Sequence, residues 1–90
     1  MVLKHSDRFR EQPAVGGYWT ATALSKSITC AVASDALMKY AARAGYDAKG
    51  PTEAFIVFRA VFEKLADEKF SRKDFTSAGE ILVTWQDFSR

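Results

Sequence analysis

The sequence is poor in the side chains that most enzymes use for catalysis. Its 90 residues include one histidine, His5, and one cysteine, Cys30. A single cysteine excludes a disulfide within the chain and favours a reducing compartment. No group of His, Cys, Asp or Glu has the spacing of a metal site. The glycine pair Gly16-Gly17 precedes an expected strand, whereas a phosphate-binding loop follows a strand and opens a helix. We therefore expect no enzymatic activity, no cofactor and no metal.

A cysteine–histidine nucleophilic pair would require His5 and Cys30 to lie within hydrogen-bond reach of each other. His5 falls in the polar N-terminal segment, where no pattern fixes its position. Cys30 alternates with Ile28 and Val32, which is the pattern of a strand with one buried face. We therefore interpret Cys30 as a small core residue.

The sequence also lacks a long apolar run and a large excess of charge. No run reaches the length of about 18 residues that a membrane span needs, and the start, MVLKHSDRFR, has no signal-peptide core. The formal charge of +2 is too small to indicate nucleic-acid binding by itself. A hydrophobic content of 48% with 27% charged residues is typical of a folded globular chain. We expect a single cytoplasmic domain over residues 1–90.

Several segments have the pattern of strands. Residues 18–24 are rich in aromatic and β-branched side chains, and residues 28–33 alternate, so a turn at residues 25–27 would join them as an antiparallel hairpin. Residues 80–85 contain three apolar residues in a row, which indicates a strand in the interior of the sheet. For residues 1–12, an edge strand and a mobile arm both remain open.

Two helices are expected between these strands. Ser34 as N-cap and Gly45 as C-cap delimit the first, over residues 35–44. The second covers residues 52–70, where aromatic and aliphatic residues recur at steps of three and four. This apolar stripe, which we expect to be core, consists of Phe55, Phe58, Phe62 and Leu65. The sequence thus predicts an α+β domain in the order β-β-α-α-β, with two helices on one face of a small antiparallel sheet.

Three aromatic residues are candidates for an interface. Tyr18 and Trp19 alternate across a strand, so one ring faces the core and the other faces outward. Trp85 lies near the C-terminal end. If the helices cover one face of the sheet, an exposed ring would mark a protein-binding surface. We expect the partner to be another protein or a second copy of this chain.

Nucleic-acid binding is the alternative hypothesis. The cations Lys69, Arg72 and Lys73 are interleaved with Phe70 and Phe75, a mixture that offers phosphate contacts and stacking rings. Cations at the end of a helix also complement the helix dipole without any ligand.

The sequence resembles a widespread bacterial family of small proteins of this length, known as a domain of unknown function. The matching stretches are ITCAV at 28–32, SDAL at 34–37, AF at 54–55, FR at 58–59, LA at 65–66, GEILVT at 79–84 and DF at 87–88. Phe9 stands where the family tends to have an aromatic residue. The resemblance covers residues 7–88. It implies a compact α+β domain and supplies neither an activity nor catalytic residues.

Overall fold

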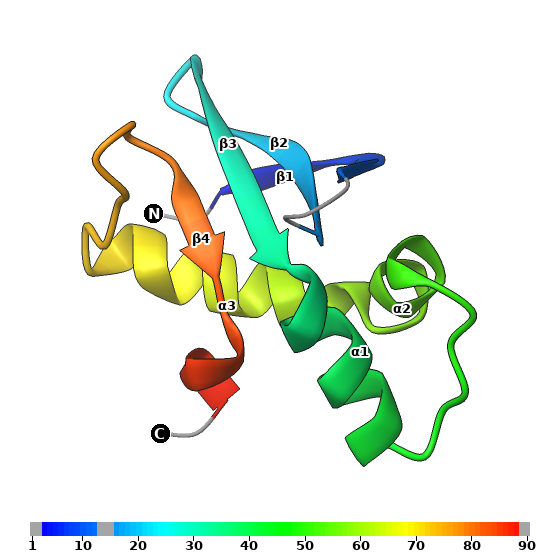
Figure 1. Cartoon of the computed structure of the whole chain (residues 1–90). Helices are drawn as coiled ribbons and strands as arrows, with labels where there is room; N and C mark the ends of the chain where they lie inside the picture. Colours follow the sequence, from blue (N-terminus) through cyan, green and yellow to red (C-terminus); the bar gives the residue numbers. More distant parts are fainter. Residues whose placement is uncertain (1–2, 13–15, 89–90) are drawn as a thin grey trace.

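The computed structural model describes residues 3–12 and 16–88. Within them the order of elements is β1 (Lys4–Gln12), β2 (Gly16–Ala23), β3 (Lys26–Ala33), α1 (Ser34–Arg43), α2 (Pro51–Val57), α3 (Arg59–Ser71), β4 (Ile81–Val83) and the 3-10 helix η1 (Trp85–Phe88). Helix α3 runs beneath the sheet, and α1 and η1 extend away from it on the same side (Figure 1). The chain is therefore an α+β domain with helices on one face of the sheet, as expected.

The sheet has the strand order β1-β2-β3-β4. The pairs β1–β2 and β2–β3 are antiparallel, whereas β4 runs parallel to β3. The prediction of a purely antiparallel sheet is therefore wrong. The chain leaves β3 through three helices before it returns, and a parallel pair of strands requires a crossover connection of this kind. The prediction that the last strand is interior is also wrong, because β4 lies at the edge.

The N-terminal segment forms the other edge of the sheet. Residues Lys4–Gln12 pair with β2, and the register shifts between His5 and Phe9. The ring of Phe9 stacks on that of Phe55 in α2, with their centroids 4.1 Å apart. Of the two possibilities left open by the sequence, the structure thus shows the edge strand.

The predicted hairpin is formed by β2 and β3. The prediction of a turn at residues 25–27 is wrong, because Ala23 pairs with Lys26 and the turn consists of Leu24 and Ser25. Their φ angles are 51° and 68°, and two positive φ angles are characteristic of a type I′ turn. Leucine rarely adopts this conformation. The side chain of Leu24 is 78% exposed.

The predicted long helix is divided into α2 and α3 at Phe58, where φ is −110° and ψ is 25°. Phe55 and Phe62 are buried in the core as expected. Phe58 and Leu65 only pack against its edge and remain partly exposed, so the expectation that all four stripe residues are core is wrong for these two. The break interrupts the helical periodicity on which that expectation depended.

Helix α1 begins one residue earlier than predicted. Its N-cap is Ala33, which makes no capping hydrogen bond through its side chain, so the prediction of Ser34 as N-cap is wrong. Gly45 has a φ of 79°, the left-handed conformation expected of the residue that ends a helix.

The core lies between the sheet and the helices. Its largest fully buried side chains are Trp19, Phe55, Phe62, Leu37, Ile81, Val32, Val83 and Cys30. They come from strands β2, β3 and β4 and from all three α-helices. In the described part of the chain, no helix is long and apolar enough to cross a membrane.

Gly16 is needed because backbone atoms approach it closely. It has a φ of 136°, and a Cβ at this position would overlap the carbonyl oxygen of Val32. We expect Gly16→Ala to lower the free energy of unfolding by about 1–3 kcal/mol, because the overlapping atom belongs to backbone that cannot rotate away. Urea unfolding followed by circular dichroism measures this. Gly50→Ala is the matched control, since a Cβ there meets nothing within 4 Å; equal losses in both variants would contradict the prediction.

Candidate functional site

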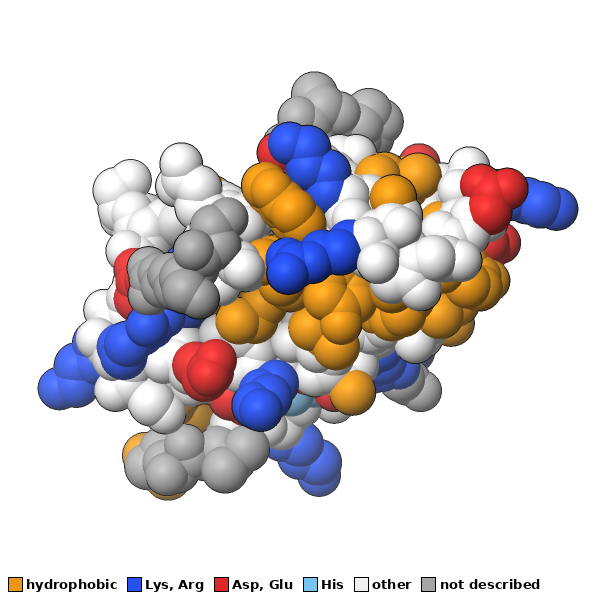
Figure 2. Space-filling model, turned by 90° about the horizontal axis from the view of Figure 1, so that it is seen from below, with side chains coloured by type: hydrophobic (Ala, Val, Ile, Leu, Met, Phe, Trp, Pro, Cys, Tyr) orange, Lys and Arg blue, Asp and Glu red, His pale blue; other side chains and the backbone are white. Residues whose placement is uncertain are grey.

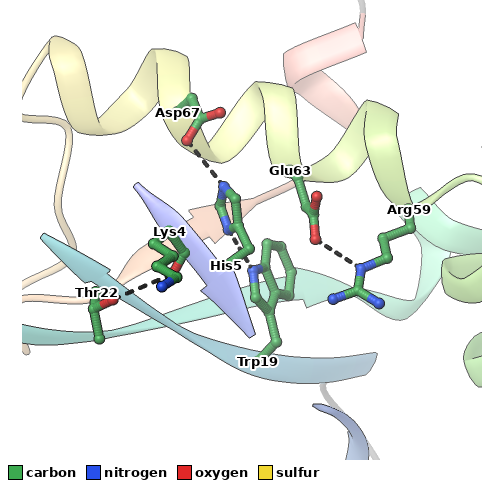
Figure 3. A network of polar contacts seen from close by, with 7 residues as sticks. All are labelled: Lys4, His5, Trp19, Thr22, Arg59, Glu63 and Asp67. Atoms are coloured by element: carbon green, nitrogen blue, oxygen red, sulfur yellow. Dashed lines mark hydrogen bonds and ion pairs between the residues drawn. The ribbon is translucent and has the colours of Figure 1, made fainter. Parts of the chain in front are cut away.

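A chain of polar side chains beneath the sheet joins β1, β2 and α3 (Figure 3). The indole Nε1 of Trp19 donates to Nδ1 of His5 at 2.9 Å. Nε2 of His5 lies 2.9 Å from Oδ1 of Asp67. Because Nδ1 accepts the indole hydrogen bond, the neutral imidazole carries its proton on Nε2 and donates it to Asp67. Two hydrogen bonds thus connect three elements that are distant in the sequence.

The imidazole of His5 is engaged on both sides. Its side chain is 9% exposed, and neither ring nitrogen is left without a partner. A general base needs an accessible lone pair within hydrogen-bond reach of a substrate. The arrangement therefore suits a structural network that holds His5, Trp19 and Asp67 in one orientation.

Arg59 makes a second connection between α3 and β1. Its Nε donates to Oε2 of Glu63 at 2.7 Å, and its guanidinium also donates to the backbone carbonyl of Ser6. Figure 3 shows the contact with Glu63. The two acceptors lie on α3 and on β1, so Arg59 links these elements directly. The edge strand β1 is therefore held against α3 by polar contacts at both His5 and Ser6.

Cys30 lies in the core and is fully buried. Burial, together with the nearby carboxylates of Asp67 and Glu63, raises the pKa of its thiol to about 12. Only a thiolate acts as a nucleophile or a metal ligand. The interpretation of Cys30 as a core residue is thus confirmed.

Lys69 does not lie where the nucleic-acid hypothesis requires it. Its side chain is 9% exposed, and Nζ lies 3.1 Å from Oδ1 of Asp87 and 3.4 Å from Oδ2 of Asp74. The ammonium group links the end of α3 to η1. Lys69 is therefore removed from the predicted phosphate contacts, whereas Arg72 and Lys73 are exposed.

The structure does not bring the three predicted interface residues together. Trp19 is 1% exposed and faces the helices, so it is not part of an exposed surface. Tyr18 is partly exposed and, as the neighbour of Trp19 along β2, points to the opposite, open face of the sheet. Trp85 is partly exposed in η1, on the helical side. Of the three, only Trp85 belongs to a larger group of surface rings.

Five rings on the helical side form a continuous series of contacts, which we call the aromatic chain. Its members are Trp85, Phe88, Tyr40, Phe58 and Tyr46. Successive centroids along this order are 5.5, 5.0, 5.1 and 5.8 Å apart. Tyr46 is 37% exposed, and the other four are intermediate in exposure.

Seen from below, the side on which α1 and η1 lie, hydrophobic side chains gather in a band across the molecule (Figure 2). Lys and Arg side chains border this band on both sides (Figure 2). One of the cations near the aromatic chain is Lys39, whose Nζ lies 5.9 Å from the ring centroid of Trp85, within the range of a cation–π contact. The aromatic chain is therefore an apolar surface with the cation of Lys39 at its Trp85 end and the carboxylate of Glu53 beside Tyr46.

Sequence reasoning identified Trp85 but missed the other four members of the aromatic chain. Phe58 was assigned to the core because the break between α2 and α3 leaves no signal in the periodicity. Tyr40 occupies a position at helical spacing on α1, which is equally compatible with the core. No local pattern indicates that three separate segments place their rings side by side.

The hydrogen bonds that run from Trp19 through His5 to Asp67 give a prediction about stability. We expect His5→Phe to lower the free energy of unfolding by about 1–3 kcal/mol, because it leaves the buried indole N–H of Trp19 without an acceptor. A double-mutant cycle with Trp19→Phe, measured by urea unfolding, isolates this contact, and we expect a coupling energy of about 1 kcal/mol or more. Strictly additive losses would show that the hydrogen bond does not contribute to stability.

The position of Cys30 gives a second prediction. We expect no labelling of the native protein by Ellman's reagent at pH 8, because the thiol is fully buried and its pKa is about 12. In 6 M guanidinium chloride the same thiol should react completely within minutes. Spectrophotometry at 412 nm follows both reactions, and rapid labelling of a protein that circular dichroism shows to be folded would contradict the prediction.

Comparison with known proteins identifies the fold. No protein-family model and no curated protein sequence matches this chain. The structure is similar to the crystal structure of a protein of unknown function from the DUF1488 family of Shewanella loihica PV-4. The TM-score is 0.75 with 18% sequence identity over 90% of each chain. At this identity the likeness shows the fold alone, and it confirms what the sequence resemblance implied: the fold is that of a small, uncharacterised bacterial α+β protein.

Proposed function

We propose that this protein is a non-enzymatic module that binds another protein through the aromatic chain. The observation that carries the proposal is the series of five partly exposed rings that extends from Trp85 to Tyr46. Aromatic residues are enriched in protein interfaces, where a few large rings provide most of the binding free energy.

The rings are held in place before any partner arrives. Tyr40 contacts the buried ring of Phe62 at a centroid distance of 5.7 Å, and Phe88 contacts the same ring at 5.9 Å. A side chain that is already fixed loses little conformational entropy on binding, so more of its contact energy contributes to affinity. The aromatic chain thus has the preorganisation of a binding surface.

The charges around the aromatic chain favour a partner other than a second copy. The outer side of α1 carries Lys39 and Arg43, and Lys39 forms an ion pair with Asp35 at 3.9 Å. Two copies that met through this side would bring these cations together, and the chain as a whole carries a net charge of +2. We therefore propose a partner whose apolar contact surface is bordered by Asp or Glu side chains.

The geometry of His5 and Cys30 supports the non-enzymatic part of the proposal. The imidazole uses both nitrogens within the polar chain, and burial keeps the thiol of Cys30 protonated at neutral pH. Among the described residues, no group of three or more His, Cys, Asp or Glu could hold a metal ion. Nucleic-acid binding has less support, because Lys69, one of the three predicted contacts, is buried and paired with Asp74 and Asp87. Arg72 and Lys73 remain exposed.

Site-specific photo-crosslinking tests the proposal. We expect benzoylphenylalanine at Tyr46 to crosslink one protein in cells of the source organism, whereas the same probe at Phe75 does not. The two positions match in exposure, at 37% and 39%, and Phe75 lies outside the aromatic chain. The crosslinked protein is then identified by mass spectrometry and purified. We expect its affinity, measured by calorimetry, to fall at least about tenfold with Tyr46→Ala and with Lys39→Glu.

Three results would overturn the proposal. They are crosslinks between two copies of this chain, crosslinks of equal yield from both positions, and unchanged affinity of the purified pair in both variants. Thermal unfolding of each variant shows whether the variant is still folded, so that a loss of affinity is not caused by unfolding.

A further inference from the structure

An open cleft lies at the other end of α3 from Phe58. Its volume is about 830 Å³, and it separates the β2–β3 hairpin from the segment that follows α3. Because β3 and β4 are parallel, both strands begin at the same end of the sheet, and the hairpin loop and the segment before β4 therefore lie at that end (Figure 1). Small-molecule sites have volumes of about 300–1,000 Å³, so the cleft has the size of a ligand site.

Apolar side chains form the depth of this cleft. Ala23 is buried, and Ile28 and Phe70 are partly buried. Leu24 and Phe75 are exposed to solvent, at 78% and 39%. Exposure therefore increases from the base of the cleft to its mouth, as in a pocket that receives an apolar body from solution.

The polar lining of the cleft has one sign of charge. Lys26 comes from the hairpin and Lys73 from the segment after α3, so each wall contributes one exposed ammonium group. Ser27 and Ser71 add hydroxyl groups, and no Asp or Glu is among the described residues that line the cleft. This pattern complements an anion.

Two residues that line the cleft have an unfavourable backbone conformation. Leu24 and Lys73 line the cleft with φ angles of 51° and 57°. A residue other than glycine, asparagine or aspartate in this region raises the free energy of the folded state. Leu24 is exposed, so its side chain makes no core contacts that offset this cost. The turn therefore has an apolar side chain facing solvent at a position where glycine or asparagine would be more favourable.

The end of α3 does not oppose a negative charge as strongly as a free helix terminus would. The carbonyls of Glu68, Lys69 and Phe70 accept hydrogen bonds from the backbone N–H groups of the next segment. The partial negative charge of these carbonyls is therefore compensated within the chain. Lys26 and Lys73 are the charged residues among those that line the cleft.

We propose that the cleft binds the acyl chain of a fatty acid, with its carboxylate between Lys26 and Lys73. The alkyl chain lies against Ile28 and Phe70, and Leu24 and Phe75 close over it at the mouth. This site is separate from the aromatic chain, and it therefore stands or falls independently of the proposed protein partner.

A titration with two ten-carbon amphiphiles of opposite charge tests this site. We expect sodium decanoate, added below its micelle concentration, to cause saturable shifts in ¹H–¹⁵N spectra at Ser27, Ile28, Ser71 and Gly79, which line the cleft. Decyltrimethylammonium has the same chain length and the opposite charge. We expect it to bind at least tenfold more weakly, because it faces two ammonium groups.

Variants assign the contacts. The double change Lys26→Gln and Lys73→Asn should weaken decanoate binding at least tenfold, and asparagine tolerates the positive φ of Lys73. Lys49→Gln, which alters an exposed lysine outside the cleft, should leave binding unchanged. Phe75→Ala should also weaken binding, and Val57→Ala, at an apolar residue of similar exposure outside the cleft, is its control.

Equal affinity for the cationic amphiphile would overturn the carboxylate assignment. Shifts that do not saturate, or that spread over the whole chain, would overturn the cleft as a site. Unchanged binding by the double lysine variant, with circular dichroism showing a folded protein, would overturn the proposed placement of the anion.

Discussion

The hydrogen-bonded series from Trp19 through His5 to Asp67 is the contact on which the rest of the structure depends. Trp19 is the largest side chain of the core, and its indole N–H has to find an acceptor away from water. His5 provides that acceptor at Nδ1 and donates a hydrogen bond from Nε2 to Asp67 on α3. Because both donors and both acceptors are matched, the edge strand β1, the central strand β2 and α3 are held in one relative position. A core of this size has few other side chains that could replace the contact.

The break at Phe58 explains why the helical side carries an aromatic surface. A continuous helix would have aligned Phe55, Phe58 and Phe62 on one buried stripe. The break turns Phe58 away from that line, so its ring meets Tyr40 and Tyr46 at the surface. Phe62 remains buried and supports Tyr40 and Phe88 from below. The surface rings are thus the outer layer of the same aromatic packing that forms the core.

The sequence predicted the class of the fold, the β2–β3 hairpin and the burial of Cys30, because each depends on a local pattern. Alternation at Ile28, Cys30 and Val32 is readable in one strand, whereas the pairing of β4 with β3 depends on how three helices pack. The same limit applies to the sites. Trp85 was recognised as a large ring near an end of the chain, but the burial of Lys69 depends on Asp87, which lies 18 residues further along. Contacts between distant segments leave no periodicity in the sequence.

Phe58 of the aromatic chain and Phe70 of the cleft lie at opposite ends of α3, whereas η1, which carries Trp85 and Phe88, is linked to the last turn of α3 by Lys69 and Asp87. The 13 residues of α3 span about 20 Å at 1.5 Å per residue. Phe58 of the aromatic chain precedes the helix, and Phe70 of the cleft lies in its last turn. Between them, Asp67 holds the helix to His5, and Arg59 holds it to Ser6 of β1. Coupling between two sites requires an element with two arrangements that both ligands can bias. Because α3 is held to β1 at two points and to η1 through Lys69, we expect occupancy of the cleft to leave the affinity of the aromatic chain unchanged.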